Sequence, residues 1–105
     1  MPIRSLTPAE AQALLASGEI DLVDVREPHE WAGGHIEGAR HVPLAELARD
    51  PRRHAPRDGV AFVCAHGLRS LTAASIASSI GRERVYSVEG GTVAWAGAGL
   101  PLVRD

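Results

Sequence analysis

The chain has 105 residues, of which 45% are hydrophobic, and this is the size of one compact domain. Thirteen acidic residues against eleven basic ones give a formal net charge of -2, so no overall positive field would attract nucleic acid or an anionic membrane. No apolar run approaches the roughly twenty residues that span a bilayer, and the N-terminus lacks the apolar core of a secretory signal. We therefore expect a single cytoplasmic domain over residues 1–105, with no nucleic-acid or membrane partner.

Short apolar runs alternate with helical patterns in the first half of the chain. Thr7, followed by Pro8 and by Glu10, has the capping-box pattern that begins a helix. Pro43 favours a strand end or a sheet edge, because proline cannot donate a ladder hydrogen bond. The expected elements, in order, are a strand over 3–6, a helix over 8–17, a strand over 20–25, a short helix over 28–31, an extended piece over 40–44 and a short helix over 44–50.

The second half continues the same alternation. The expected elements are a polar surface connection over 51–59, a fully buried strand over 60–64, an alanine-rich helix over 69–80, a strand over 84–88 and a short helix over 90–99 that carries Trp95. In the alanine-rich helix we expect Leu71, Ala74, Ile76 and Ile80 to face the core. Such alternation favours an α/β fold of parallel βαβ units, with helices on both faces of the sheet.

Cys64 is the one cysteine of the chain and stands at the end of the buried strand. A lone cysteine forms neither an internal disulfide nor a zinc thiolate cluster, so it serves packing or reactivity. In open parallel sheets the reactive crevice lies beyond the carboxyl ends of the strands. The loop that contains Gly67, and the helix start behind it, can aim backbone N–H groups at the sulfur as an anion cradle. Such a cradle lowers the pKa of a thiol, whereas an inert buried thiol is the alternative.

Three segments resemble the rhodanese-like sulfurtransferase domains. DLVDVREPHEWAGGHIEGARHVPL at 21–44 resembles the family's D-x-R-x-x-x-E segment followed by G-H-I-x-G-A. CAHGLRS at 64–70 resembles its active-site loop C-x-x-G-x-R-S, and VYSVEGGTVAWAGAGLP at 85–101 resembles its closing pattern. The resemblance implies a five-stranded, mostly parallel sheet with helices on both faces. It also implies that Cys64 attacks the outer sulfur of a donor such as thiosulfate, becomes a persulfide and hands that sulfur to a thiophilic acceptor.

The active-site loop supplies the expected substrate and persulfide site. Arg69 is expected to bind the anionic part of the donor or to stabilise the persulfide, and Ser70 to cap the helix or bond within the loop. His66 either tunes the thiolate or faces solvent. Leu68 is expected to line an apolar rim where donor or acceptor docks. The whole predicted set around the sulfur is Ala65, His66, Gly67, Leu68, Arg69 and Ser70.

Five further residues are expected to support the loop. By the resemblance, Asp24 anchors neighbouring loops at the end of the second strand. Arg26 and Glu30 lie four apart over a short helix, so we expect a salt bridge between them. Gly90 and Gly91 follow the last strand and are expected to let the backbone come close to the active-site loop.

The sequence thus predicts a thiosulfate sulfurtransferase that uses no metal or organic cofactor. The five histidines show no metal-ligand spacing, and we expect His35 to pack a loop. Because no second cysteine can resolve a persulfide, the sulfur must leave to cyanide, a small thiol or a thioredoxin-like protein. A sulfur-carrier or regulatory module that acts on a protein partner stays open. A cysteine phosphatase or arsenate reductase is less favoured, because four residues separate Cys64 from Arg69 where those enzymes have five, and the loop offers no general acid.

Overall fold

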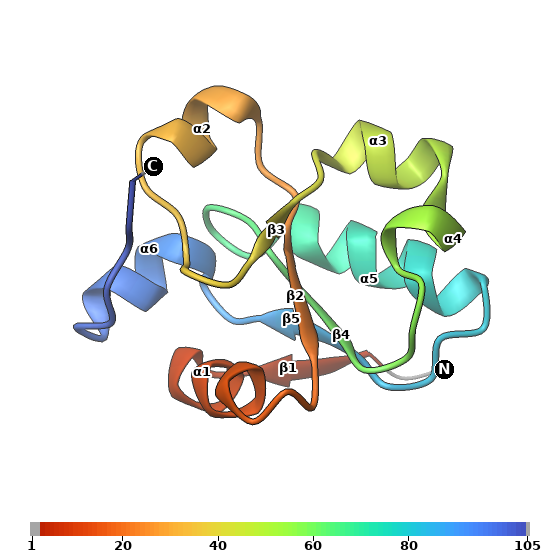
Figure 1. Cartoon of the computed structure of the whole chain (residues 1–105), viewed down its shortest axis with the longest axis horizontal. Coiled ribbons are helices and arrows are strands. Elements are labelled where there is room, and N and C mark those ends of the chain that lie inside the picture. Colours follow the sequence, from red (N-terminus) through yellow and green to blue (C-terminus); the bar gives the residue numbers. More distant parts are fainter. Residues whose placement is uncertain (1–2, 105) are drawn as a thin grey trace.

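The strands form one parallel sheet in the order β1-β5-β4-β2-β3 in a computed structural model of the chain, which describes residues 3–104 (Figure 1). The strands are β1 (Arg4–Leu6), β2 (Asp21–Asp24), β3 (Arg40–His41), β4 (Val60–Val63) and β5 (Val85–Val88). The helices are α1 (Pro8–Ala16), α2 (Pro28–Ala32), α3 (Leu44–Arg49), α4 (Pro51–His54), α5 (Arg69–Ser79) and α6 (Gly91–Gly97). The predicted α/β fold with five parallel strands is confirmed.

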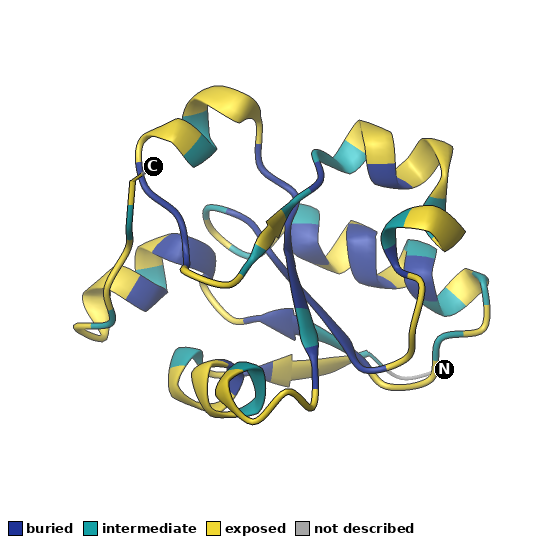
Figure 2. Cartoon of the chain, viewed as in Figure 1, coloured by how far each residue is buried: buried dark blue, intermediate teal, exposed yellow. Residues whose placement is uncertain are grey.

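Apolar layers lie on both faces of the sheet. One layer joins β2, β4 and β5 to α3 and α5, and it contains Val23, Phe62, Leu47 and Ala74. The other joins the opposite face to α1 and α6, and its largest side chain is Trp95. Buried residues therefore follow the central strands β2, β4 and β5 and the inner sides of the longer helices (Figure 2). Because its two faces are both covered, β4 is a continuous run of buried apolar residues.

Local signals in the sequence account for several boundaries. The Thr7 Oγ1 accepts a hydrogen bond from the Glu10 N–H at 3.2 Å, and the Glu10 carboxylate accepts one from the Thr7 N–H at 2.9 Å. This reciprocal pair is the predicted capping box, and it begins α1. Pro43 directly precedes α3, and β3 is a two-residue strand at the edge of the sheet, as the proline indicated.

The polar connection expected over 51–59 instead begins with the helical turn α4. Pro51 occupies the first position of that turn, where proline is tolerated because its missing N–H has no intrahelical partner. The Ala55 N–H bonds to the Pro51 carbonyl at 2.8 Å, and the Ala55 side chain is buried. Arg82 Nε also donates to the Ala55 carbonyl at 2.7 Å, so both the side chain and the backbone of Ala55 fix the end of the turn.

The expected core stripe of α5 is wrong in part. Leu71 is 44% exposed, whereas the residues buried against the sheet are Ser70, Ala73, Ala74 and Ala77. Small side chains let the helix lie close to the strands, and the larger Leu71 is left on the outer side. The helix therefore presents its first turn, with Ser70 inward, to the end of β4.

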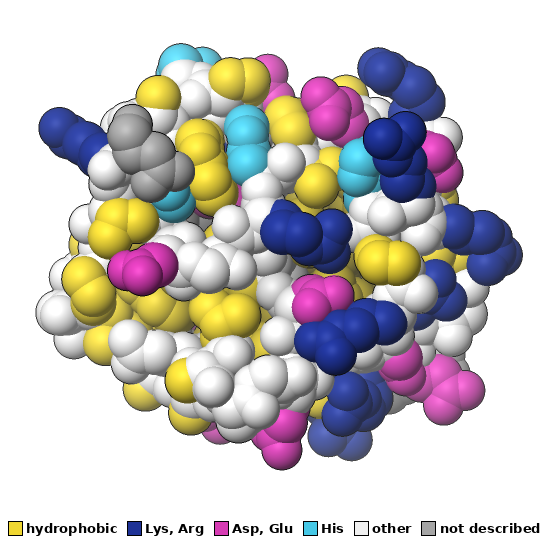
Figure 3. Space-filling model, viewed as in Figure 1, with side chains coloured by type: hydrophobic (Ala, Val, Ile, Leu, Met, Phe, Trp, Pro, Cys, Tyr) yellow, Lys and Arg dark blue, Asp and Glu magenta, His cyan; other side chains and the backbone are white. Residues whose placement is uncertain are grey.

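The surface carries charges of both signs. Arginine and acidic side chains are interspersed on the right-hand part of the face seen in Figure 3, and hydrophobic side chains are more frequent on its left-hand part. None of the helices within residues 3–104 has the length and apolar character that crossing a bilayer requires.

Candidate active site

Cys64 directly follows β4, at the carboxyl end of the central strands. The neighbouring strand β2 continues alongside it, since the Val25 N–H bonds to the Val63 carbonyl at 2.9 Å. The chain then turns through residues 65–68 and enters α5. As a residue Cys64 is 1% exposed, so its sulfur lies beneath the loop that follows it.

Hydrogen-bond donors of the loop converge on this sulfur. The Gly67 N–H donates to Cys64 Sγ at 3.1 Å, and the Ser70 N–H donates at 3.4 Å. The Ser70 hydroxyl oxygen lies 3.7 Å from the same sulfur. Gly67 has a φ of 101°, which favours glycine, and a Cβ at this position would lie 3.2 Å from the Gly90 nitrogen. The loop thus has the form of the anion cradle that the sequence predicts.

Burial and hydrogen bonding act in opposite directions on the pKa of Cys64. Burial raises it, because an apolar environment disfavours the charged form. The backbone N–H and hydroxyl of Ser70 lower it, as do the backbone N–H groups of Gly67 and His66, and the net pKa of the thiol lies below its ordinary value. The site therefore favours an anionic sulfur, which is the nucleophilic form.

The start of α6 holds the loop from the other side. The Thr92 N–H donates to the Cys64 carbonyl at 2.8 Å, and the Val93 N–H donates to the Ala65 carbonyl at 3.1 Å. Gly91 has a φ of 62°, and a Cβ there would overlap the carbonyl oxygens of Cys64 and Ala65. Gly90 also adopts a positive φ, of 68°. The paired glycines therefore lie directly against the active-site loop.

Arg69 is bound to a carboxylate at the edge of the site. Its Nη1 and Nη2 donate to the two carboxylate oxygens of Glu30 at 2.6 and 2.9 Å. Hydrogen bonding by Arg69 is the main cause that lowers the pKa of Glu30 to about 2, against an opposing effect of burial. The backbone N–H of Glu27 and the charges of Arg69 and Arg26 lower it further. This pair ties α2 to the first residue of α5.

The salt bridge expected between Arg26 and Glu30 is therefore wrong. Arg26 instead pairs with Asp24, with Nη2 at 2.9 Å from Oδ2, and it donates from Nη2 to the Gly34 carbonyl at 2.7 Å. Arg26 lies before the first turn of α2, so it is not one helical turn below Glu30 and the helical spacing rule does not apply. Asp24 is completely buried, and its pairing with Arg26 satisfies the buried charge.

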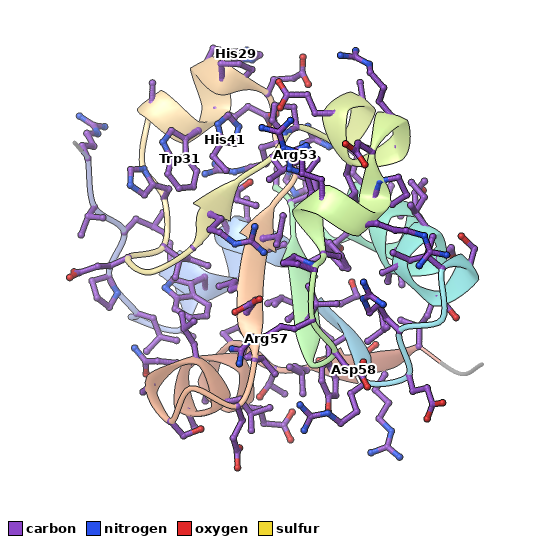
Figure 4. The ribbon with its side chains drawn as sticks, turned by 45° about the vertical axis from the view of Figure 1, so that its right-hand side comes forward. His29, Trp31, His41, Arg53, Arg57 and Asp58 are labelled. Atoms are coloured by element: carbon purple, nitrogen blue, oxygen red, sulfur yellow. The ribbon has the colours of Figure 1, made fainter. Side chains whose placement is uncertain are left out.

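Aromatic rings pack the segment between β2 and β3. The ring of His35 stacks on Trp31 with 3.6 Å between centroids. The ring of His41 also stacks on Trp31, with 4.8 Å between centroids, and Figure 4 shows these two side chains together. His35 is 4% exposed, and its Nδ1 lies 3.1 Å from the Trp31 carbonyl oxygen. His35 thus packs a loop, as expected. Among residues 3–104, no three histidine, cysteine or acidic side chains gather where they could hold a metal ion.

Exposed apolar side chains stand close to the loop. Leu68 is 77% exposed, and Val93, in the first turn of α6 on the other side of the loop, is 56% exposed. His66 is also exposed. Leu68 therefore faces outward from the loop, which is the position that an apolar docking rim would need.

The family model of the Rhodanese-like domain matches residues 7–98, a range that includes every residue placed around the sulfur. The chain belongs to the rhodanese-like domain family. A thiosulfate sulfurtransferase GlpE from Pseudomonas entomophila is 37% identical over 95 residues, which cover 88% of this chain and 84% of that protein. This likeness supports membership of the sulfurtransferase family.

Solved structures show the same likeness. A rhodanese-related protein from Thermoplasma volcanium aligns with a TM-score of 0.84 at 34% identity, covering 97% of this chain and 99% of that one. A protein of unknown function from Rhodopseudomonas palustris, named as a possible tyrosine phosphatase, aligns with a TM-score of 0.83 at 35% identity, covering 96% and 85%.

The sequence did not predict one residue of this rhodanese-like site, Ser87. Ser87 of β5 places its hydroxyl oxygen 2.7 Å from that of Ser70, which lies 3.7 Å from the sulfur of Cys64. Its signal is a polar residue in VYSV, at a position that shares its face of the strand with the buried Val85. The pattern alone shows a buried polar side chain but not the partner, because Ser70 lies seventeen residues away in the sequence.

Proposed function

We propose that the protein is a rhodanese-type sulfurtransferase that carries sulfane sulfur as a persulfide on Cys64, with thiosulfate as donor. We further propose that residues 1–105 act as one domain. The observation that carries the proposal is the cradle at the end of β4, where the N–H groups of Gly67 and Ser70 lie 3.1 and 3.4 Å from Cys64 Sγ. These donors favour a negative charge on the sulfur that must attack.

In the first step the Cys64 thiolate attacks the outer sulfur of thiosulfate. A bond forms between the two sulfurs as the original S–S bond breaks, and sulfite leaves with the electron pair of that bond. The product is a Cys64 persulfide whose terminal sulfur carries the negative charge. The backbone N–H groups that donate hydrogen bonds to the thiolate can then donate to the persulfide anion, so the same donors stabilise both states.

In the second step an acceptor attacks the terminal sulfur and frees the Cys64 thiolate. Cyanide leaves as thiocyanate, and a thiolate acceptor leaves as a persulfide. The chain has one cysteine, so the acceptor is a separate molecule. Because cytoplasmic thiols are kept reduced, we propose a small thiol or a thioredoxin-like protein there as the acceptor in the cell.

Of the two roles expected for Arg69, we propose the stabilisation of an anionic sulfur and not the direct binding of the donor. Both of its terminal nitrogens are bonded to Glu30, so we assign it to holding the loop against α2 and not to gripping the donor directly. Its positive charge interacts with the Cys64 sulfur and adds to the preference for an anion. We keep Leu68, which is 77% exposed, as the apolar contact for the docking molecule.

Intact-mass measurement tests the proposal directly. Wild-type protein treated with thiosulfate should gain the mass of one sulfur atom, and cyanide should remove it with release of thiocyanate. Cys64→Ser should gain nothing under the same conditions. A wild-type protein that stays unmodified with thiosulfate but gains sulfur from a persulfidated protein would replace the proposed enzyme by a dedicated sulfur carrier.

The name given to the Rhodopseudomonas palustris protein calls for a phosphatase control. Four residues separate Cys64 from Arg69, and the loop they form contains no carboxylate that could protonate a leaving alcohol. We therefore expect no hydrolysis of an aryl phosphate above the level of Cys64→Ser. Hydrolysis that depends on Cys64, without sulfur uptake, would contradict the proposed function.

A further inference from the structure

We propose that Ser87 is a positioning residue for the chemistry at Cys64, acting through the hydroxyl of Ser70. In this inference the Ser87 hydroxyl holds the Ser70 hydroxyl in the orientation that favours an anionic sulfur. It rests on the proposed function to the extent that the anionic sulfur is the reacting form. Neither the loop motif nor the paired glycines include Ser87.

The position of Ser87 in the sheet makes a hydroxyl unexpected. Val85 and Ser87 share the face of β5 that lies toward α5. Phe62 of the adjacent strand β4, and Cys64 directly after that strand, belong to the same apolar layer. Ser87 is 3% exposed. A valine would suit such a buried strand position better, because burying a hydroxyl costs free energy unless it is hydrogen-bonded. The hydroxyl therefore needs a partner, and Ser70 is the one that the structure provides.

The contacts form a short chain that ends at the sulfur. Ser87 Oγ lies 2.7 Å from Ser70 Oγ, and Ser70 Oγ lies 3.7 Å from Cys64 Sγ. Ser70 is completely buried. Both side chains are held by regular structure, since Ser87 pairs with Phe62 in the ladder between β5 and β4, and Ser70 lies in the first turn of α5. The two hydroxyls are thus fixed in place but free to rotate their hydrogens.

Each hydroxyl has one hydrogen to donate and can accept in return, so the chain can run in either direction. With a neutral thiol, the S–H donates toward Ser70 Oγ and the Ser70 O–H donates to Ser87. When the thiol has lost its proton to solvent, the Ser87 O–H donates to Ser70 and the Ser70 O–H points at the sulfur. Reversal needs rotation of hydrogens only. In the proposed cycle this sulfur alternates between a thiolate and the uncharged inner atom of a persulfide. The hydroxyls of Ser70 and Ser87 can reverse their hydrogen bonds to match each of these two states.

Titratable side chains occur on several segments around the site, and replacement of Ser87 changes none of these residues. They come from the end of β2 and the segment that follows it, from α2, from the loop, from the start of α5 and from the residue after β5, and are Asp24, Arg26, Glu30, His66, Arg69 and Glu89. Four of these are bound in the pairs Asp24–Arg26 and Glu30–Arg69. A change in the titration of Cys64 when the Ser87 hydroxyl is removed can therefore be attributed to the loss of that hydroxyl.

The test is the thiolate absorbance of Cys64 as a function of pH. Ser87→Ala should move the midpoint to higher pH, so that the thiolate fraction below the midpoint falls about threefold, as for loss of one supporting hydrogen bond in a buried network. Ser87→Thr keeps a hydroxyl and should restore the wild-type profile. Ser5→Ala is the matched control, because Ser5 is the exposed partner of Ser87 in the neighbouring strand β1. Its profile should equal that of the wild type.

A double-mutant cycle separates action through Ser70 from a general loosening of the core. Ser87→Ala should have no further effect on the midpoint in a Ser70→Ala background, because the link to the sulfur is then already absent. If Ser87→Ala does not fold, Ser87→Val fills the space without a hydroxyl and carries the same prediction.

An unchanged midpoint in Ser87→Ala or Ser87→Val would overturn the inference, as would equal effects of Ser87→Ala with and without Ser70. The titration needs no sulfur donor. If the wild-type protein takes up no sulfur, the proposed function is refuted. The effect of Ser87→Ala on the thiolate midpoint can still be interpreted in that case.

Discussion

Two opposing effects of neighbouring residues determine whether the sulfur of Cys64 is charged. Burial favours the neutral thiol, whereas the donors supplied by Ser70, Gly67 and His66 favour the anion and prevail. The sequence predicted this cradle because Gly67 and the helix start lie close to Cys64 along the chain. Ser87 and the Glu30–Arg69 pair were not predicted, because they depend on contacts between segments far apart in sequence.

The Glu30–Arg69 pair gives a prediction on stability and pH. The folded pKa of Glu30 is about 2, below its ordinary 4.5, so its ionised form stabilises the folded state. This contribution is fully present above pH 4.5 and is lost as the pH falls through about 2. Solvent screens a partly exposed pair, so Glu30→Gln should lower the free energy of unfolding at pH 7 by about 1 kcal/mol.

Urea unfolding at several pH values measures this contribution. The difference between wild type and Glu30→Gln should shrink as the pH falls from 4.5 toward 2. Glu46→Gln, at an exposed position of α3, is the matched control and should change little at any pH. A Glu30→Gln difference that is the same at pH 7 and at pH 2 would show that the pair does not contribute through its charge.

At the scale of elements, the loop is held between the first turns of α5 and α6. The sequence predicted both helices and nearly all strands, because capping residues, glycines and apolar runs are local signals. It did not predict α4, a single turn that ends beside the buried Ala55. It placed Ala74 correctly on the side of α5 that faces the sheet but also placed Leu71 there, because the inward side is set by how closely small residues let the helix approach.

The contact between α6 and the loop predicts a severe effect for Gly91→Ala. The added Cβ would overlap the carbonyl oxygens of Cys64 and Ala65, at a residue whose φ is 62°. We expect the free energy of unfolding to fall by about 3 kcal/mol, measured by urea unfolding. Gly97→Ala is the matched control in the same helix, since a Cβ at Gly97 meets nothing within 4 Å and its effect should be neutral or slightly stabilising. Equal effects of the two substitutions would contradict the proposed close contact.

At the scale of the whole molecule, residues from three distant parts of the chain meet at the carboxyl end of the sheet. They lie within 24–30, 64–70 and 87–93, and the strand order β5-β4-β2 brings these segments side by side. The resemblance noted in the sequence covers the same segments, and for that reason the site could be located before its contacts were known. The chain has one cysteine, so a thiol signal from the intact protein has a single source.

The anionic character of the Cys64 sulfur is tested most directly by the thiolate titration of wild-type protein, with Cys64→Ser subtracted to remove the absorbance of Tyr86. We predict a midpoint below the ordinary thiol value of about 8.5, because the backbone N–H groups of the loop outweigh burial. A midpoint at or above that value would contradict it, since the sulfur would then be an ordinary buried thiol.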